Sequence, residues 1–392
     1  MNMEANPMGV LVFESALTGH RRHYLEVAAK ALEGADVKPV FCIPEEGEFS
    51  APSCTIDRCV GKHSSSGPSS ALARLKFLAQ GILRHKPEVV IIPTGDGLAM
   101  LLWMLTPLFV LRGVRVACVL HRLRFGYDQG GRRGQMIRLL NYLSIVLSPR
   151  VDFFSVDEVP VKALAEGFNP FGLKVERMPD PLLAVERGSK EKARERLGLP
   201  ARAKLLGCLG VIDERKGALE MLKVAENLPS DCFLLLAGKF SPAVEVEARR
   251  LSTLLGDRLI CMNRFLEEGE LFDALISLDG MVLLQRGHIG ISSFALHAMR
   301  VGVPVFCAET PWFKLMHCQY PGSLTMNSDP AAMLQDMASW AGTVAGTRGA
   351  ASAVARHFSK EQFSKVLRDF VRGGEMASLP AEDGPVQASS RS

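Results

Sequence analysis

The chain has 392 residues, of which 47% are hydrophobic and 22% charged, and its formal net charge is +4. These values are close to globular averages and exclude a fibrous, disordered or nucleic-acid-binding chain. The length is too great for one small core and suits two domains. The nine cysteines show no metal-ligand spacing, so we expect free, mostly buried thiols and a reducing compartment.

No segment is typical of a secretion signal or a membrane span. The first residues, Met1–Ser15, have no basic region followed by an apolar one. The longest apolar stretch, Leu98–Leu111, contains Pro107 and is shorter than the roughly 20 residues of a spanning helix. We therefore expect a cytoplasmic protein in which Leu98–Leu111 forms a buried helix.

Short β-type runs alternate with helical patterns in the first half of the chain. The predicted strands are Val10–Phe13, Val37–Ile43, Val89–Pro93, Val114–Leu120 and Asp152–Val156. The predicted helices are His20–Leu32, Ala71–Arg84, Leu98–Leu111, Arg133–Leu147 and Val159–Gly167, with a polar segment at Lys62–Ser70. Such alternation predicts a parallel sheet covered by helices on both faces.

The pattern restarts after Asp180–Pro200, which reads as a linker carrying one short solvated helix. The next strands are predicted at Lys204–Leu209, Cys232–Ala237, Leu259–Met262, Gly280–Leu284 and Val303–Ala308. Helices are predicted at Ala218–Asn227, Val244–Leu255, Glu268–Ser277, Ser292–Val301, Ala331–Thr343, Ala350–His357 and Lys360–Val371. The sequence thus predicts an α/β protein with two Rossmann-like domains, residues 8–180 and 200–355, facing a cleft. Helix 358–372 should return to the first domain, and residues 373–392 should form a disordered tail.

A glycine loop precedes one predicted helix in the second half. Within Leu278–Val305, the loop that contains Gly290 and Ile291 leads to Ser292 and Ser293 at the helix start. Hydroxyls and free N–H groups at this position can hold a phosphate. Plain capping of a buried helix has the same pattern, and these residues alone favour neither interpretation.

Two cations lie between another strand and its helix. Arg215 and Lys216 precede Gly217 within Gly207–Ala225. They could neutralise a diphosphate, with Arg215 making forked contacts and Lys216 acting as a point charge. The alternative is a solvated turn with ordinary surface charges, which these residues taken alone favour somewhat.

Together these segments resemble the retaining glycosyltransferases of family four, which have the GT-B fold. Gly210, Lys216 and Gly217 match the family pattern G-x5-K-G-x-x-x-L, and Gly290, Ala298, Met299, Gly302 and Pro304 match its closing loop and helix. Gly19-His20, Val119-Leu120-His121 and Ser155–Asp180 resemble segments of its first domain. The resemblance spans roughly residues 10 to 372.

The family's E-x7-E glutamates are both replaced, by Ile289 and His297. In the family the first usually lies near the transferred sugar and the second usually receives the ribose hydroxyls. We assign His297 and His288 to ribose or sugar recognition. Val211 stands where the family often has an arginine, so Arg215 is expected to substitute for it. These departures leave room for a non-catalytic member of the family.

The resemblance implies sugar transfer from a nucleoside-diphosphate sugar to a glycan, lipid-linked or small-molecule acceptor, with retention of configuration. No metal or other cofactor is expected, because the sequence has no Asp-x-Asp pair. The expected diphosphate ligands are Gly19, His20, Arg215, Lys216, Gly290, Ile291, Ser292 and Ser293. The alternative is a non-catalytic GT-B protein that binds a nucleotide sugar or glycan and supports a partner enzyme. A nucleotide-sugar epimerase is a third hypothesis, although few carboxylates and histidines are evident for it.

His121 and Asp96 are the predicted catalytic residues. The resemblance places His121 near the transferred sugar or the acceptor, whereas a strand-end histidine without it would be structural. Asp96 follows the strand ending at Pro93 and could accept a hydrogen bond from an acceptor hydroxyl, act as a base, or cap a helix.

The segment Gly130–Leu147 mixes arginines with apolar residues. Arg132, Arg133 and Arg138 alternate with Leu139, Leu140, Tyr142 and Leu143. Such a helix could touch an anionic membrane that carries a lipid-linked acceptor, making the protein peripheral on the inner face of the membrane. A helix with one buried stripe has the same pattern, and we favour that interpretation.

Overall fold

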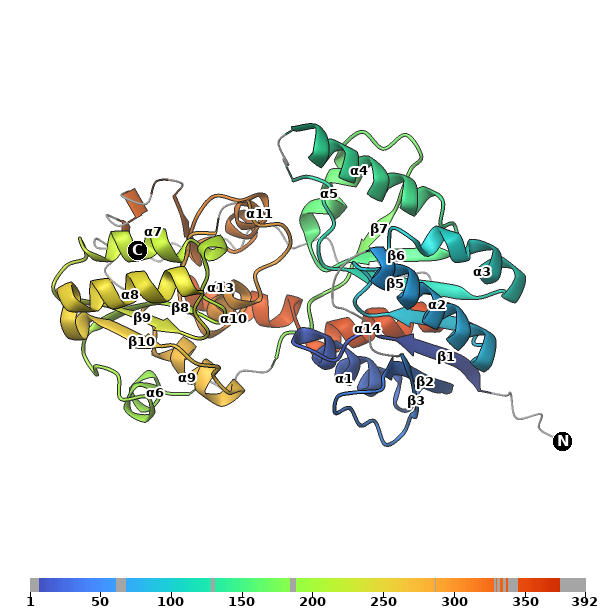
Figure 1. Cartoon of the computed structure of the whole chain (residues 1–392), viewed down its shortest axis with the longest axis horizontal. Coiled ribbons are helices and arrows are strands. Elements are labelled where there is room, and N and C mark those ends of the chain that lie inside the picture. The colour runs from blue at the N-terminus through green and yellow to red at the C-terminus, as the bar shows by residue number, and fades with distance from the viewer. Residues whose placement is uncertain are drawn as a thin grey trace, which may run out of the picture. The chain divides into compact units, whose positions relative to one another are not determined.

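The structure is a computed structural model, which describes residues 7–60, 68–127, 131–183, 188–285, 287–327, 329, 332–333, 336–337 and 345–373. The chain divides into two compact units, each built on one parallel sheet (Figure 1). Unit 1 contains the described residues up to Pro181, the short segment Ile289–Ile291, and the described residues from Phe358 onwards. Unit 2 contains the described parts of Leu182–His288 and Ser292–His357.

Unit 1 has a seven-stranded sheet in the order β3-β2-β1-β4-β5-β6-β7. The strands are β1 (Met8–Phe13), β2 (Val37–Pro44), β3 (Thr55–Val60), β4 (Val89–Ile92), β5 (Arg115–Leu120), β6 (Val151–Ser155) and β7 (Val175–Arg177). The helices are α1 (His20–Leu32), α2 (Pro68–His85), η1 (Leu102–Leu105), α3 (Thr106–Arg112), α4 (Gly131–Val146), α5 (Glu158–Glu166) and α14 (Lys360–Val371).

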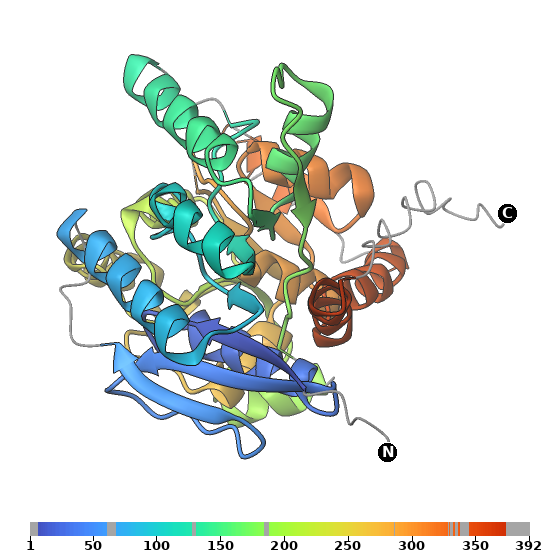
Figure 2. The ribbon, with the colours of Figure 1, turned by 90° about the vertical axis from the view of Figure 1, so that its right-hand side faces the viewer.

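Helices cover both faces of this sheet. On one face α1 and α14 pack together and bury Tyr24 and Phe363, whose rings meet edge to face. On the other face α2 packs over β1, β2 and β3, which lie side by side in blue in Figure 2. The alternation predicted from the sequence is therefore confirmed as a parallel α/β sheet.

The sequence predicted one helix at Leu98–Leu111, and this prediction is wrong. Turns occupy the start of the segment, followed by η1 and then α3. Pro107 lies in the first turn of α3, where its missing N–H is tolerated, whereas it would disrupt the middle of a longer helix.

Unit 2 has a six-stranded sheet in the order β10-β9-β8-β11-β12-β13. The strands are β8 (Lys204–Leu209), β9 (Cys232–Ala237), β10 (Leu259–Met262), β11 (Gly280–Leu283), β12 (Val305–Cys307) and β13 (Leu324–Met326). The helices are α6 (Lys190–Arg196), η2 (Glu214–Lys216), α7 (Ala218–Ala225), α8 (Pro242–Leu255), η3 (Gly256–Arg258), α9 (Glu268–Ser277), α10 (Ser293–Val301), α11 (Pro311–Gln319) and α13 (Ala345–His357). Much of the helix predicted at Ala331–Thr343, most of Lys62–Ser70 and the predicted tail beyond Gly373 lie outside the described residues.

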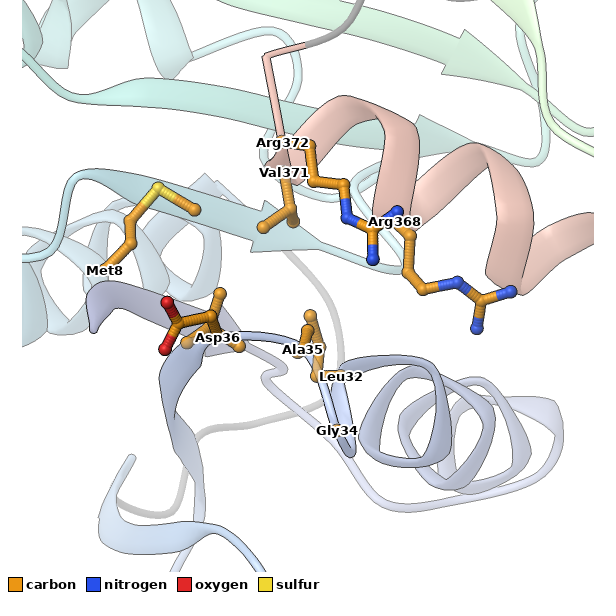
Figure 3. Close-up of a pocket in the computed structure, with 9 residues that line it drawn as sticks. Met8, Leu32, Gly34, Ala35, Asp36, Arg368, Val371 and Arg372 are labelled. Carbon is orange, nitrogen blue, oxygen red and sulfur yellow. The ribbon is translucent and has the colours of Figure 1, made fainter. Parts of the chain in front are cut away.

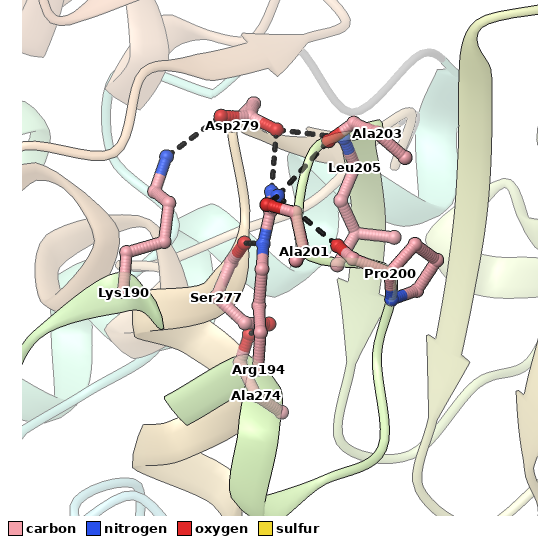
Figure 4. A network of polar contacts seen from close by, with 9 residues as sticks. All are labelled: Lys190, Arg194, Pro200, Ala201, Ala203, Leu205, Ala274, Ser277 and Asp279. Carbon is pink, nitrogen blue, oxygen red and sulfur yellow. Dashed lines mark hydrogen bonds and ion pairs between the residues drawn. The ribbon is translucent and has the colours of Figure 1, made fainter. Parts of the chain in front are cut away.

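The sequence predicted that the charged helix α6 would be solvated, and for Arg194 this prediction is wrong. Arg194 is only 4% exposed, and its guanidinium donates to the carbonyls of Ser277, Pro200, Ala201 and Ala203. It also pairs with Asp279 at 2.7 Å, and Asp279 binds Lys190 and the Leu205 N–H at the same distance (Figure 4). Because the five guanidinium donors fan out in one plane, Arg194 ties α6 to the start of β8 and the end of α9.

One side of α4 packs against the core of unit 1 through Ile145 and Tyr142, in keeping with the single buried stripe favoured from the sequence. Its buried residues are Gly134, Ser144 and Ile145, while Met136, Leu139, Leu140 and Leu143 are all exposed. In the part of the chain that the structure describes, no helix is both long enough and apolar enough to cross a membrane.

Candidate functional site

Each sheet has one point where the strand order reverses, and such points bind ligands in doubly wound folds. In unit 1 this point lies between β1 and β4, and in unit 2 it lies between β8 and β11. Many of the residues predicted as functional follow these strands directly. Since carboxyl strand ends and the first turns of helices attract polar ligands, we describe the two points in turn.

Glu14 is the buried acid at the reversal point of unit 1. It follows β1, is 1% exposed, and accepts hydrogen bonds from the Ser15 N–H at 2.7 Å and from Arg21 at 3.0 Å. The hydroxyl of Thr94, which follows β4, donates to the other carboxylate oxygen. Burial raises the pKa of Glu14, while the charge of Arg21 opposes this effect. The sequence analysis missed Glu14, although its place directly after a buried strand was a usable signal.

The two predicted catalytic residues, Asp96 and His121, lie together and meet through the main chain. Asp96 Oδ1 accepts the N–H groups of His121 at 2.9 Å and of Arg122 at 3.0 Å. Asp96 thus fixes the turn after β5, and the alternative that it caps a helix is wrong. Its carboxylate is exposed and therefore accessible to a ligand.

The His121 ring is held in one orientation. Its Nε2 lies 3.2 Å from the Pro93 carbonyl, and its centroid lies 4.8 Å from that of Tyr24 and 5.2 Å from that of His20. Because a carbonyl only accepts, Nε2 carries the proton and Nδ1 keeps its lone pair. Desolvation lowers the pKa of His121 and favours this neutral form.

Gly19 and His20 begin α1 beside this ring. Gly19 is the N-cap with φ 62°, a left-handed conformation that glycine adopts without strain. Desolvation, followed by the effect of His121, lowers the pKa of His20 to about 4. Gly19 and His20 thus bring the first amides of α1 near His121, while their role toward a diphosphate stays a prediction.

A second buried acid lies beneath α1. Burial raises the pKa of Asp180 to about 7, and the Tyr24 hydroxyl interacts with it. The sequence analysis gave Asp180 no role beyond the boundary between the family-like stretch Ser155–Asp180 and the linker that follows it. Its environment shows that it is a desolvated carboxyl at the close of unit 1.

Gly290 and Ile291 belong to unit 1, although their neighbours in the chain belong to unit 2. The Gly290 N–H donates to the Tyr127 hydroxyl at 3.2 Å, and a Cβ at Gly290 would lie 2.5 Å from the His121 carbonyl oxygen. Ile291 packs against the core beneath α1 and α14. A phosphate could use the Gly290 amide only after the bond to Tyr127 opens, so this role stays a prediction.

The Tyr127 hydroxyl in turn donates to Asp157, which is fully buried. Asp157 also caps α5 by accepting the Val159 N–H at 2.9 Å. Burial raises the pKa of Asp157 to about 6. The chain Asp157–Tyr127–Gly290 joins residues distant in sequence, and no local pattern could predict it.

Lys216 is the cation at the reversal point of unit 2. Asp213 caps η2 by accepting the Lys216 N–H at 3.0 Å. The Lys216 ammonium donates to the Leu209 carbonyl at the end of β8, at 2.9 Å, and lies 4.8 Å from the centroid of the Phe294 ring. Desolvation lowers its pKa. Since a carbonyl and a ring face carry no formal charge, they orient the ammonium without neutralising it.

The start of α10 lies next to Lys216. Ser292 is its N-cap and accepts the Ala295 N–H at 3.4 Å, while Ser293 is exposed. Phe294 fills the space over Gly210, where a Cβ would approach its ring to 2.6 Å. The structure therefore brings Lys216 and the positive end of α10 together, as the sequence predicted.

Arg215 is less constrained than Lys216. Its side chain is 56% exposed, and its Nε lies 3.6 Å from Asp213 within the same turn. The guanidinium can therefore reorient toward a ligand, which its role at the diphosphate would require.

His297 and His288 occupy different environments. His297 lies in α10 and packs its ring edge-on against Phe272 of α9, with centroids 5.5 Å apart. His288, in the loop before α10, is half-buried. The contact with Phe272 gives His297 a packing role, while recognition of ribose or sugar by either histidine stays a prediction.

A cavity among the described residues lies away from both reversal points. It measures about 280 Å³ and lies between the first residue of β1, Met8, and the end of α14. Figure 3 shows Met8 and Asp36 on one side, and Arg368 of α14 and the C-cap residue Arg372 on the other. Because it lies at the amino ends of the strands, it carries no argument for the predicted chemistry.

No protein-family model and no curated protein matches the sequence. Solved structures do match it. The sucrose-phosphate synthase of Thermosynechococcus elongatus is 17% identical with a TM-score of 0.69, over 93% of this chain and 98% of that chain. HepE of Anabaena in complex with UDP is 12% identical with a TM-score of 0.67, over 93% and 100%. The catalytic domain of starch synthase IV from Arabidopsis thaliana, bound to ADP and acarbose, is 12% identical with a TM-score of 0.63, over 94% and 99%. The predicted class is thereby confirmed: the chain has the α/β, two-sheet fold of the GT-B glycosyltransferases.

Proposed function

We propose that the chain is a glycosyltransferase that moves a sugar from a nucleoside-diphosphate sugar to a glycan, lipid-linked or small-molecule acceptor. The observation that carries the proposal is the position of Lys216, a desolvated ammonium beside the start of α10 at the reversal point of unit 2. Among structures of the same fold, HepE is solved with UDP and with UDP-glucose, and the starch synthase with ADP. Their bases differ, so a ribose diphosphate is the part that they share.

Transfer requires stabilisation of the leaving diphosphate. Negative charge develops on it as the bond to the sugar breaks, and a preorganised cation in a desolvated site stabilises that charge strongly. Lys216 supplies the cation, and the free amides of the first turn of α10 supply a dipole. In this proposal Arg215 swings onto the diphosphate, Ser292 and Ser293 line it, and no metal ion takes part.

Unit 1 supplies the acceptor side of the reaction in this proposal. The neutral His121 imidazole offers an acceptor lone pair at Nδ1, suited to a sugar or acceptor hydroxyl. The exposed Asp96 fixes the turn that carries His121 and can accept a second hydroxyl. Buried Glu14 holds Arg21 and Thr94 in place between them.

Retention of configuration and membership of family four also belong to this proposal. Ile289 and His297 stand where that family has glutamates, and the packing of His297 on Phe272 favours one alternative. In that alternative the protein binds a nucleotide sugar or glycan without turning it over and supports a partner enzyme.

A screen of ligands followed by a hydrolysis assay tests these two functions. Thermal unfolding should be measured with UDP, GDP, ADP and their sugars; a ligand at 100 times its Kd adds about 2.7 kcal/mol to the free energy of unfolding. Release of nucleoside diphosphate from the bound donor, without acceptor, then identifies an enzyme. Binding without release would support the non-catalytic alternative, and no shift with any nucleotide would contradict both.

We further propose that a lipid-linked acceptor is reached at an anionic membrane through α4, with the protein lying peripherally on it. Met136 is 57% and Leu139 51% exposed, and Arg132 and Arg133 are exposed on the same helix. The nearby Phe171, whose ring contacts Tyr142 of α4, is 66% exposed. Exposed apolar side chains flanked by arginines suit an interface with acidic lipids.

Sedimentation with vesicles tests this surface. We expect the protein to sediment with phosphatidylserine-containing vesicles more than with neutral ones, and the variant Met136→Glu/Leu139→Glu to remain in the supernatant. Val246→Glu, a change at an equally exposed apolar residue on α8, is the matched control and should still sediment. Equal sedimentation of both variants would contradict the proposal.

A further inference from the structure

Side chains from three elements of unit 1 converge on the face of the sheet that α2 covers. Cys42 lies in β2, Asp57 in β3, and His85 is the last residue of α2. One atom from each, the thiol sulfur, a carboxylate oxygen and an imidazole nitrogen, lie within 4.8 Å of one another. His85 Nε2 is 2.6 Å and Cys42 Sγ 4.0 Å from Asp57 Oδ2. These are the ligand atoms that zinc prefers.

A second thiol, that of Cys59, lies beside this group of three but outside the 4.8 Å that joins their ligand atoms. Cys59 lies two residues beyond Asp57 in β3, and Asp57 is in register with Cys42. The register is irregular after Asp57, but Cys59 packs against the same core cluster as Cys42, so its thiol lies on the same face of the sheet. The Cys59 thiol interacts with both the Cys42 thiol and the Asp57 carboxylate.

The space around these atoms suits a small ion. Ligand atoms of a tetrahedral zinc are roughly 3.3–3.8 Å apart, given bonds of about 2.0–2.3 Å, so shifts of side chains alone would seat the metal. A Cβ at Gly81 of α2 would lie 3.1 Å from Cys42 Sγ, so the glycine leaves room beside the sulfur. Asp57 is 16% and His85 22% exposed, which allows an ion to enter from solvent.

The charges also favour a cation. A divalent ion with two thiolates and one carboxylate leaves one negative charge in excess. Arg84, which pairs with Asp57 at 2.7 Å from a largely exposed position, balances that charge.

We propose that Cys42, Cys59, Asp57 and His85 form a zinc-binding site that fastens the edge strand β3 to β2 and to the end of α2. On binding, each thiol releases its proton to solvent and coordinates the ion as a thiolate, and the His85 proton shared with Asp57 moves from Nε2 to Nδ1 so that Nε2 can bind the ion. No zinc motif is evident in the sequence, because the ligands come from three elements at unequal spacing. The site is independent of the proposed sugar transfer.

Zinc binding by the full chain tests the proposal. Chelator-treated protein should take up about one equivalent of Zn²⁺ after dialysis, measured by elemental analysis, and should unfold at a higher temperature. Cys59→Ser and His85→Ala should each lower the affinity at least tenfold. Cys54→Ser is the matched control, because Cys54 packs against the core on the opposite face of the sheet; this variant should bind zinc as the wild type does.

A spectroscopic measurement on the wild-type protein avoids the risk that a variant fails to fold. With Co²⁺ in place of Zn²⁺, we expect thiolate-to-cobalt charge-transfer bands and the visible spectrum of a tetrahedral ion. Cobalt bound without these bands, zinc uptake unchanged in Cys59→Ser and His85→Ala, or no zinc uptake by the wild type would each overturn the proposal.

Discussion

The two reversal points of the molecule differ in charge and in how fully their polar groups are bonded. In unit 1, Glu14 is buried and receives hydrogen bonds from main-chain and side-chain donors, and His121 is held neutral between aromatic rings. In unit 2, Lys216 is a desolvated cation held by a carbonyl and a ring face. The two parallel sheets therefore carry chemically different groups at their reversal points. A neutral, hydrogen-bonding end suits sugar hydroxyls, and a cationic end beside a helix start suits a diphosphate.

Of the substitutions that test this difference between the units, the removal of the Lys216 cation should have the largest effect on nucleotide binding. Lys216→Ala should weaken binding of the nucleotide identified in the ligand screen by about tenfold or more, because a charge-assisted contact contributes roughly 1.5–3 kcal/mol. Calorimetric titration measures the change. Lys223→Ala removes an exposed lysine of α7 and should bind like wild type. If Lys216→Ala bound the nucleotide as tightly as the wild type does, Lys216 would not account for the difference between the two reversal points.

A buried acid of unit 1 offers a sharper test of desolvation. Burial raises the pKa of Asp180 from its ordinary value of 3.8 to about 7, so between these two pH values the folded state binds more protons than the unfolded state. Stability should therefore fall as the pH rises from about 4 to 7. Asp180→Asn removes this loss and should be more stable than wild type at pH 8, by on the order of 1–3 kcal/mol.

The two proteins should unfold alike at pH 3, where Asp180 is largely protonated in both states. Urea unfolding at both pH values measures the difference, and Asp257→Asn, at an exposed position, is the control. An Asp180→Asn protein that gains no stability at pH 8 would show that the Asp180 carboxyl is well solvated.

The smallest effect concerns His297. If it receives the ribose, His297→Ala should weaken nucleotide binding severalfold, and His297→Glu should keep or tighten it, because a carboxylate can accept from both ribose hydroxyls. Phe272→Leu, which changes the ring that His297 contacts, controls for packing. Wild-type nucleotide affinity in His297→Ala would leave His297 as a packing residue of α10.

Strongly periodic segments of the fold were predictable. The bounds of α1, α9 and α14 agree with the sequence analysis, because their apolar residues recur at helical spacing. β3 was missed because Thr55–Val60 is an edge strand with Asp57 and Arg58 in its middle, which weakens the β pattern. β7 and β13 were missed because each has only three residues.

The candidate site was predictable only where it follows a strand or begins a helix. Lys216, Ser292 and His121 occupy such positions, so strand–helix alternation located them. The hydrogen bond from Gly290 to Tyr127 joins residues 163 positions apart, and the pairing of Glu14 with Thr94 spans 80. Those partners are set by tertiary packing, which single-sequence patterns do not encode.

The anchoring of α6 by Arg194 has a practical consequence for dividing the chain. Unit 2 begins at Leu182, and a fragment that started at Pro200 would lack both Arg194 and Lys190. The Ser277 carbonyl and the Asp279 carboxylate would then lose donors at the point where α9 leads into β11. A fragment meant to fold alone should therefore start before Ser189, the residue that caps α6. Such a fragment keeps the donors that hold the junction of α9 and β11 together.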